Sequence, residues 1–259
     1  MITYNIATIT IALSAPFALP SWKSFETKAP SESDLTIEVM PEVHQRYGLE
    51  PFTLHTEETI GFRRGAEVMF TDAAWRHVRI LAPVHTEHWQ SFLIQAFYAH
   101  ALSRRMIQIH SSLIRFHGEG LMFIGPSGIG KTTQAELWQT YRNSDIINGD
   151  MVFIQQTNDR FIGWGTPWHG SSPYCMNTNV PIKAVIVLQQ DSRNQIRRLH
   201  GFEKVTALSR NIIFPQWLPD GTQKCLDILN PFVQYIPVYE LSCRRDEDAI
   251  QMTEDFIFS

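Results

Sequence analysis

A glycine-rich segment directly after a short apolar run constrains this chain more than any other feature of its sequence. Residues 125–132 read GPSGIGKT and match the pattern G-x-x-x-x-G-K-[ST] at every fixed position. Residues 121–124 before the segment are apolar, and residues 134–141 after it follow a helical pattern. The sequence therefore predicts a strand, a glycine-rich turn and a helix in direct succession.

A segment of this kind binds phosphate groups. Its successive backbone N–H groups form a nest for anions, and the positive end of the following helix dipole adds to the attraction. Lys131 can reach the β- and γ-phosphates of a nucleotide, and the Thr132 hydroxyl can bind Mg²⁺. We therefore expect ATP and Mg²⁺ as ligands, with GTP and pyrophosphate left open as other phosphate donors. The candidate nucleotide-binding residues are Gly125, Pro126, Ser127, Gly128, Ile129, Gly130, Lys131, Thr132 and Thr133.

The strand that leads into this segment is predicted to pair with the residues just before it. Residues 111–116 and 121–124 are both apolar, and only His117-Gly118-Glu119-Gly120 separates them. Two apolar runs joined by a glycine-containing turn are typical of a β-hairpin. The common doubly wound nucleotide-binding fold reaches its loop from a parallel βαβ unit instead. We therefore predict an α/β fold with a mixed sheet around the phosphate-binding loop.

The rest of the chain divides into a β-rich N-terminal subdomain, residues 1–85, and a catalytic domain, residues 86–259. We expect no flexible linker between them, so that the first subdomain packs on the second. The expected strands of the first subdomain are 2–13, 35–39, 59–62, 67–70 and 77–81. A helical pattern covers 86–106. After the loop helix we expect strands at 145–154 (interrupted at 148–150), 161–165, 184–188 and 238–243, and helices at 202–213, 221–232 and 246–258.

Composition excludes several classes of function. A formal charge of -4 gives no reason to expect nucleic acid or an anionic membrane surface as a partner. No run reaches the roughly 20 apolar residues of a membrane span. Residues 2–20 are apolar but lack the basic start of a signal peptide, and we interpret 2–13 as a strand. The widely spaced Cys175, Cys225 and Cys243 indicate reduced thiols and a cytoplasmic location.

Two further residues have side chains suited to phosphoryl transfer. Asp150 lies downstream of Lys131 at the bend of a predicted strand, where its carboxylate can hold Mg²⁺ or accept a proton from a hydroxyl. It can equally be a turn residue of Asn148-Gly149-Asp150. His110 directly precedes the hairpin, which would carry it toward the loop, although an isolated histidine is more often structural.

The loop from residue 165 to 179 is rich in glycine, proline, serine and asparagine. Thr166 and His169 can contact substrate or phosphate, and Trp168 can shape a pocket. The alternative is a packed surface loop. Lys183, at the start of the next strand, can add positive charge to a phosphate site or be an ordinary strand-end charge.

Taken together, these residues resemble a known family. His110, the hairpin, residues 125–132 and Asp150 resemble the catalytic domain of HPr kinase/phosphorylase, which is itself similar to the nucleotide-binding core of phosphoenolpyruvate carboxykinases. Residues 111–150 and 165–188 resemble still more the short bacterial serine kinases of peptide modification, such as lasso peptide kinases. The resemblance covers about residues 105–190.

The resemblance implies an ATP-dependent, Mg²⁺-assisted kinase that phosphorylates a hydroxyl, most simply a serine of a peptide or small protein. It implies that His110, Asp150 and Lys131 are catalytic and that Thr132 and Asp150 hold the metal. It also allows a homo-oligomer. The chain lacks the region that HPr kinase uses for its phosphorylase reaction and for docking HPr, so the second reaction is not expected.

The chain departs from the family pattern at residue 149. The family has an Asp-Asp pair where this chain reads Gly149-Asp150, which leaves one carboxylate, with Asp145 as a candidate helper. Thr132 replaces the usual serine and is chemically equivalent as a Mg²⁺ ligand. The missing carboxylate favours, as an alternative, a non-catalytic nucleotide-binding accessory protein of peptide maturation. A small-molecule kinase acting on free serine or a sugar is a further alternative.

Overall fold

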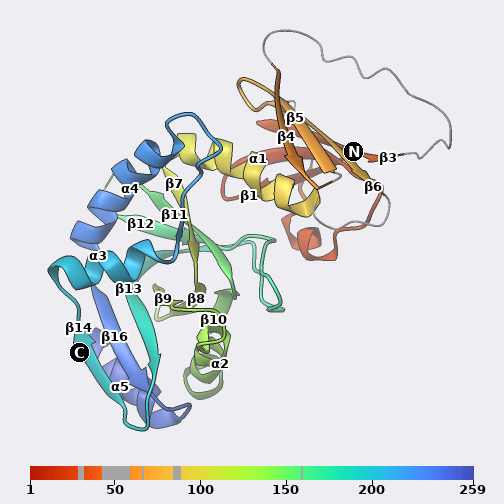
Figure 1. The fold of residues 1–259 in the computed structure, drawn as a ribbon. Helices are drawn as coiled ribbons and strands as arrows, with labels where there is room; N and C mark the ends of the chain where they lie inside the picture. The colour runs from red at the N-terminus through yellow and green to blue at the C-terminus, as the bar shows by residue number, and fades with distance from the viewer. Residues whose placement is uncertain (29–31, 43–58, 66, 84–88, 159) are drawn as a thin grey trace. The chain divides into compact units, whose positions relative to one another are not determined.

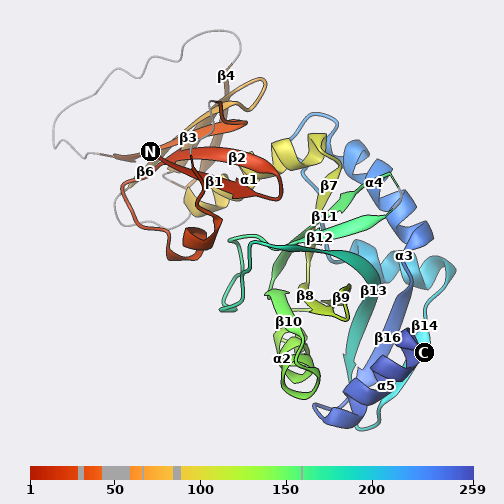
Figure 2. The same cartoon turned by 180° about the vertical axis from the view of Figure 1, so that it is seen from behind.

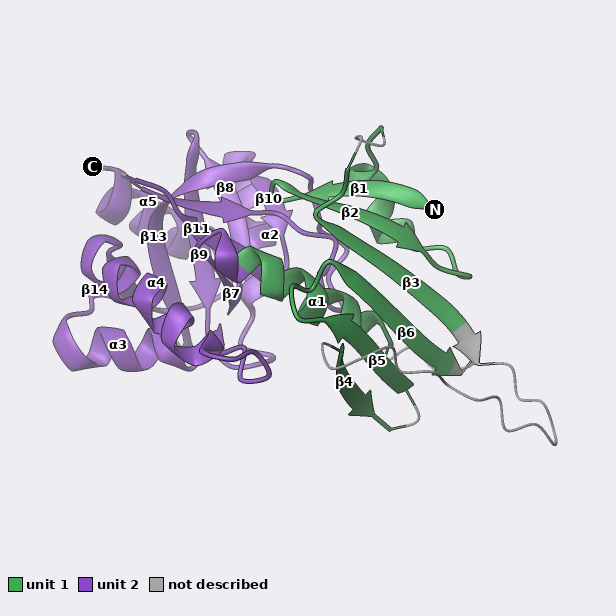
Figure 3. Cartoon of the chain, turned by 90° about the horizontal axis from the view of Figure 1, so that it is seen from above, with its two compact units in different colours: residues 1–101 green, residues 102–259 purple. Residues whose placement is uncertain are grey.

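The computed structural model describes all residues except 29–31, 43–58, 66, 84–88 and 159 (Figure 1). The chain divides into two compact units, Met1–Ala101 and Leu102–Ser259 (Figure 3). Most of helix α1 (Trp89–Ser103) therefore belongs to the first unit, whereas the predicted second domain includes residues 86 onward. The predicted boundary itself, between 85 and 86, lies outside the described residues.

The first unit is built on a mixed six-stranded sheet in the order β1-β2-β3-β6-β5-β4. β3 runs parallel to both β2 and β6, and the remaining neighbours are antiparallel. A short 3-10 helix, η1 (Pro20–Phe25), buries Trp22 and Phe25. The strands are β1 (Ile2–Ile6), β2 (Ile9–Ser14), β3 (Leu35–Glu42), β4 (Thr59–Arg64), β5 (Glu67–Asp72) and β6 (His77–Pro83).

The prediction of one strand over residues 2–13 is wrong, because the chain turns back on itself in the middle. Ile2 pairs with Leu13 and Ile6 with Ile9, so the segment is a hairpin. Ala7 and Thr8 form the turn at φ 46° and 69°. Such tight turns usually contain glycine or asparagine at positive φ. Because neither residue stands here, the apolar pattern runs through the turn without an interruption.

The second unit is an α/β structure around a mixed ten-stranded sheet, as predicted. Its main path is β10-β8-β9-β13-β12-β11-β7-β15, and β16 pairs with β13 and β14. The predicted hairpin is confirmed, since β8 and β9 are antiparallel neighbours. The strands are β7 (Met106–His110), β8 (Ser112–Phe116), β9 (Glu119–Ile124), β10 (Asp145–Asn148), β11 (Met151–Gln156), β12 (Phe161–Trp164), β13 (Asn179–Gln190), β14 (Gln195–Arg198), β15 (Ile212–Ile213) and β16 (Val238–Cys243). The helices are α2 (Lys131–Arg142), α3 (Gly201–Ser209), α4 (Gly221–Tyr235) and α5 (Glu247–Phe258).

Several elements differ from their predicted bounds. The helical pattern expected to 106 ends at Ser103, Arg105 adopts φ 58°, and residues 106–110 form β7. β13 is much longer than the predicted 184–188, and Figure 2 shows it running beside β16. Its first part contains Pro181 and pairs antiparallel with β12, while its later part pairs parallel with β9 and β16. The helix expected over 202–213 stops at Ser209, and β14 and β15 were not predicted.

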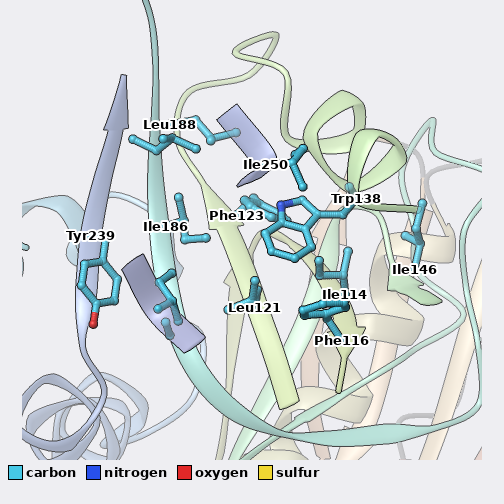
Figure 4. Close-up of a cluster of buried hydrophobic side chains, with 14 residues drawn as sticks. Ile114, Phe116, Leu121, Phe123, Trp138, Ile146, Ile186, Leu188, Tyr239 and Ile250 are labelled. Carbon is cyan, nitrogen blue, oxygen red and sulfur yellow. The ribbon is translucent and has the colours of Figure 1, made fainter. Parts of the chain in front are cut away.

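A buried apolar cluster fixes α2 against the sheet (Figure 4). Trp138 of α2 is fully buried and packs edge-on against Phe116 of β8, with 5.1 Å between ring centroids. Leu121 and Phe123 of β9 belong to the same cluster. Burying large side chains in this way contributes on the order of 2 kcal/mol each. The start of α2 is therefore held at the end of β9.

Ion pairs hold the other end of α2 to α5. The guanidinium of Arg142 donates to Glu254 at 2.5 Å and to Glu247 at 3.2 Å. α5 begins at Glu247 because the carboxylate of Asp246 accepts the backbone N–H of Ala249, a standard N-cap. Among the described residues, no helix is long and apolar enough to cross a membrane.

Candidate functional site

The glycine-rich loop, residues 125–130, joins β9 to α2 as the sequence predicts. Gly125, Gly128 and Gly130 have φ values of 146°, 79° and 111°, which side chains other than glycine rarely adopt. A Cβ atom placed on Gly128 would have no atom within 4 Å. The glycines are therefore required by the backbone conformation, and the space around Gly128 is open.

Lys131 is the first residue of α2, and its ammonium turns back into the glycine-rich loop. Its Nζ donates hydrogen bonds to the carbonyl oxygens of Gly125, at 3.2 Å, and Pro126, at 3.4 Å. The side chain is buried, and burial lowers the pKa of Lys131, while the nearby carboxylate of Asp150 partly offsets this by raising it. A buried ammonium at a helix N-terminus attracts anions strongly.

A second turn, residues 148–150, joins β10 to β11 and lies beside the start of α2. Asn148 is fully buried, and its Oδ1 accepts the backbone N–H groups of Asp150 and Met151, both at 2.9 Å. The carbonyl oxygen of Gly149 accepts the hydroxyl of Thr132 at 3.4 Å and that of Ser112 at 3.0 Å. These bonds fix the turn, and with it Asp150, next to the glycine-rich loop.

His110 and Asp150 form a close pair, as expected if the hairpin carries His110 toward the loop. The Nε2 atom of His110 lies 2.7 Å from Oδ1 of Asp150, and both side chains are partly open to solvent. The strand register places His110, at the end of β7, opposite Met151 of β11. The backbone N–H of Ser111 also donates to the carbonyl of Asp150 at 2.9 Å. The pair can exchange a proton with a hydroxyl placed against it.

The oxygen atoms near the loop fit Mg²⁺ in type. Thr132 offers a hydroxyl and Asp150 a carboxylate, which are the hard ligands that Mg²⁺ prefers. A Cβ atom on Gly170 would lie 2.4 Å from Oδ2 of Asp150, so the glycine leaves room for this carboxylate. No cluster of three or more His, Cys, Asp or Glu occurs in the part of the chain that the structure describes. A metal here would take its other ligands from phosphate oxygens and water.

The loop after β12 supports the turn at residues 148–150 from behind. Thr166 is fully buried, and its hydroxyl donates to the carbonyl of Met151 at 2.9 Å. The Nδ2 group of Asn148 donates to the carbonyls of Thr166 and Trp168 at 2.9 and 3.1 Å. His169 hydrogen-bonds the carbonyl of Ser172 through Nδ1. The side chain of Thr166 is therefore an internal support, and it does not face solvent where a substrate would bind.

The position of the missing carboxylate is filled. A Cβ atom on Gly149 would come within 1.9 Å of the Ser172 hydroxyl oxygen. Asp145 does not replace the lost acid, because it lies at the opposite end of β10 and forms an ion pair with Arg115 at 2.6 Å. The expectation that Asp145 assists Asp150 is therefore wrong.

Lys183 lies inside β13 and away from the glycine-rich loop, so neither the phosphate-site interpretation nor the strand-end one fits it. Its neighbours on β13, Ile182 and Ala184, pair with Gly120 and Leu121 at the start of β9, the end far from the glycine-rich loop. Its ammonium lies 5.6 Å from the centre of the Phe258 ring. Lys183 therefore caps part of the apolar core.

Sequence reasoning missed Asn211, which joins three parts of the site. Its Oδ1 accepts the backbone N–H of Gly125 at 3.2 Å, and its carbonyl accepts that of His110 at 2.8 Å. Its Nδ2 donates to the carbonyl of Ala207 in α3 at 3.0 Å. Asn211 falls inside a segment that the sequence predicts as helix, so no local signal separates it from a surface asparagine.

A cavity of about 560 Å³ opens beside the glycine-rich loop. His110, Gly125, Pro126 and Ser127 line one side of it. Residues of β13, β14, α3 and β16 and the segment after α3 line the rest. The site therefore brings together the glycine-rich loop, the His110–Asp150 pair and an adjoining cavity.

No family model matches the chain, and no curated protein matches it. Among solved structures, the HPr(Ser) kinase/phosphatase from Coxiella burnetii is similar over 58% of this chain and 88% of its own length. The identity is 11% and the TM-score is 0.36. This likeness is too weak to carry an argument, so the function has to be inferred from the geometry of the site.

Proposed function

We propose that this protein transfers the γ-phosphoryl group of ATP, with Mg²⁺, to a hydroxyl, and that the acceptor is a serine of a peptide or small protein. The observation that carries the proposal is the His110–Asp150 pair, at 2.7 Å, beside a glycine-rich loop that encloses the ammonium of Lys131. A loop of this kind without an acid–base pair would suit binding alone. The pair adds a group that can accept the proton of an attacking hydroxyl.

The reaction uses these residues as follows. The acceptor oxygen attacks the γ-phosphorus and forms the new P–O bond, while the bond from that phosphorus to the bridging oxygen breaks and ADP leaves. The hydroxyl proton passes to the His110–Asp150 pair. The backbone N–H groups of the glycine-rich loop and the ammonium of Lys131 balance the phosphate charge, which is the main task of a protein in phosphoryl transfer. Thr132 and Asp150 would hold Mg²⁺, which would supply further charge neutralisation.

The filled position at Gly149 favours a second candidate, a nucleotide-binding accessory protein without catalysis. With Ser172 beside Gly149, Asp150 is left to serve both the metal and the acceptor hydroxyl. A protein that only binds ATP does not need Asp150 for both tasks, because the loop and Lys131 suffice for binding.

Incubation with labelled ATP and a set of seryl peptides separates the two candidates. We expect the wild type to transfer label, the Lys131→Ala variant to lose both ATP binding and transfer, and Asp150→Asn to keep ATP binding while losing transfer. Lys224→Ala, which removes an exposed lysine of α4, is the matched control and should behave as wild type. ATP binding by the wild type with no transfer and no hydrolysis would favour the accessory protein.

A further inference from the structure

The cavity beside the glycine-rich loop has a defined orientation relative to the proposed reaction. It is lined by His110 and by Gly125, Pro126 and Ser127, the beginning of the loop. Lys131 and Thr132, which would hold the β- and γ-phosphates and Mg²⁺, are not among its lining residues, and neither is Thr133. A molecule in the cavity would therefore approach the reacting phosphate from the side of His110.

The charged side chains around the cavity differ in whether they form ion pairs. Arg197 pairs with Glu240 at 2.8 Å and with Glu203 at 2.9 Å, so both glutamates of the lining are already bound to a cation. Arg210 also lines the cavity, and it forms no ion pair with any residue that the structure describes. A guanidinium in this state is suited to a carboxylate or phosphate of a ligand.

The backbone at Arg210 is fixed relative to the reacting groups, while its side chain is exposed. Arg210 directly precedes Asn211, whose hydrogen bonds reach the backbone of both Gly125 and His110. Arg210 and His110 line the same cavity, so a carboxylate bound by Arg210 would share that cavity with a hydroxyl placed against His110.

The cavity also offers apolar surface. Leu199 and Val187 lie in its lining and are nearly buried, whereas Phe202 at the start of α3 is 84% exposed. An aromatic side chain so exposed at the edge of a cavity is suited to contact with an apolar group of a ligand. Apolar surface beside an unpaired cation matches a polypeptide with both an apolar and an acidic side chain.

We propose that this cavity binds the acceptor, and that Arg210 and Phe202 select a peptide with an acidic and an apolar residue next to its hydroxyl. The proposal rests on the proposed function and names the substrate class of the same site. It places the acceptor, and not the base of the nucleotide, against α3.

A peptide array with charge-swapped variants tests the proposal. The array holds a fixed serine and places Glu, Gln or Lys in turn at each neighbouring position, with or without an adjacent Phe. We expect the wild type to phosphorylate Glu peptides at least tenfold faster than Lys peptides. The Arg210→Glu variant should reverse this preference, and Phe202→Ala should remove the advantage of the adjacent Phe. Arg245→Glu, the same charge change at an exposed arginine outside the cavity, should keep the wild-type preference.

Equilibrium binding of ATP with Mg²⁺ is measured on the same proteins. Unchanged ATP affinity in Arg210→Glu, together with the reversed peptide preference, supports the proposal. A tenfold loss of ATP affinity in Arg210→Glu or Phe202→Ala, with the peptide preference unchanged, overturns it and assigns the cavity to the nucleotide. Transfer to peptides without any charge preference also overturns it and leaves the proposed function intact. No ATP binding by the wild type overturns the proposed function and this proposal with it.

Discussion

The two turns that form the site both contain glycine, and they contain it for opposite reasons. In the glycine-rich loop the backbone demands it, since Gly128 has φ 79° and a Cβ there would touch nothing within 4 Å. In the turn at residues 148–150 the surroundings demand it, since a Cβ on Gly149 would meet Ser172 at 1.9 Å. One turn leaves space open, and the other is tightly packed.

This difference shows how the work of the site is divided. Open space lined by N–H groups can receive a ligand, whereas a packed turn can only hold its neighbours in place. Asn148 holds the second turn through hydrogen bonds of both its side-chain nitrogen and its side-chain oxygen. The turn then positions Asp150. In the proposed function, the glycine-rich loop would therefore bind phosphate, and the turn at residues 148–150 would align Asp150.

Replacing Lys131 by methionine should have the largest effect on the binding half of the site. We expect turnover to fall by about 100- to 1,000-fold, as for the loss of one charge-stabilising group. The free energy of unfolding should stay equal or rise, because burial penalises the ammonium, as the lowered pKa of Lys131 indicates. Steady-state kinetics and urea unfolding measure the two quantities. A variant that lost turnover only through unfolding would show that Lys131 is structural.

Adding a side chain at Gly149 should disturb the packed turn. Gly149→Ala is expected to lower the free energy of unfolding by about 1–3 kcal/mol through overpacking. A second change, Ser172→Gly, removes the clashing hydroxyl and should restore most of the loss. Urea unfolding of the single and double variants gives the coupling between the two residues. Strictly additive losses would contradict the packing explanation.

Adding a side chain at Gly128 should act on binding more than on stability. Gly128→Ala places a methyl group in open space, so the expected cost is about 1 kcal/mol from the unfavourable φ alone. ATP affinity should fall more, by about tenfold or 1.4 kcal/mol, because the methyl group enters the space that a phosphate would occupy. Calorimetric titration of ATP beside urea unfolding checks this, and a stability loss as large as that of Gly149→Ala would remove the contrast between the two turns.

A pH series should give the smallest effect. The pKa of Lys131 is lower in the folded protein than its ordinary value of 10.5. At a pH between the folded and the unfolded pKa, Lys131 is therefore more protonated in the unfolded chain than in the folded protein. Stability from this residue therefore rises with pH through that window. The difference in unfolding free energy between wild type and Lys131→Met should shift in favour of the wild type as pH approaches 10.5. A constant difference would show that the ammonium is not buried.

The sequence predicts the parts of the fold that depend on neighbouring residues. The glycine-rich loop, the β8–β9 hairpin and helix α5 all follow from residues close together in the chain. The turn at Ala7 and Thr8 was missed, because neither residue is typical of a turn at positive φ and the pairing around them holds them there.

The parts that depend on distant contacts could not be predicted. Asn211 reaches Gly125 across 86 positions of sequence, and nothing beside it in the chain marks that contact. The clash between Ser172 and Gly149 likewise exists only once β10, β11 and the following loop are assembled. The place of Lys183 also depends on such contacts, since it follows from the pairing of β13 with β9.

The long strand β13 has a consequence for how this protein is made. The β8–β9 hairpin can form as soon as its own residues leave the ribosome, but β9 also pairs with β13, which is synthesised well after α2. Parallel pairing between distant segments is slow, because the intervening chain must be closed into a loop first. The strand that carries the glycine-rich loop is thus completed late, and a growing chain acquires its ligand-binding geometry only when most of the second unit is present.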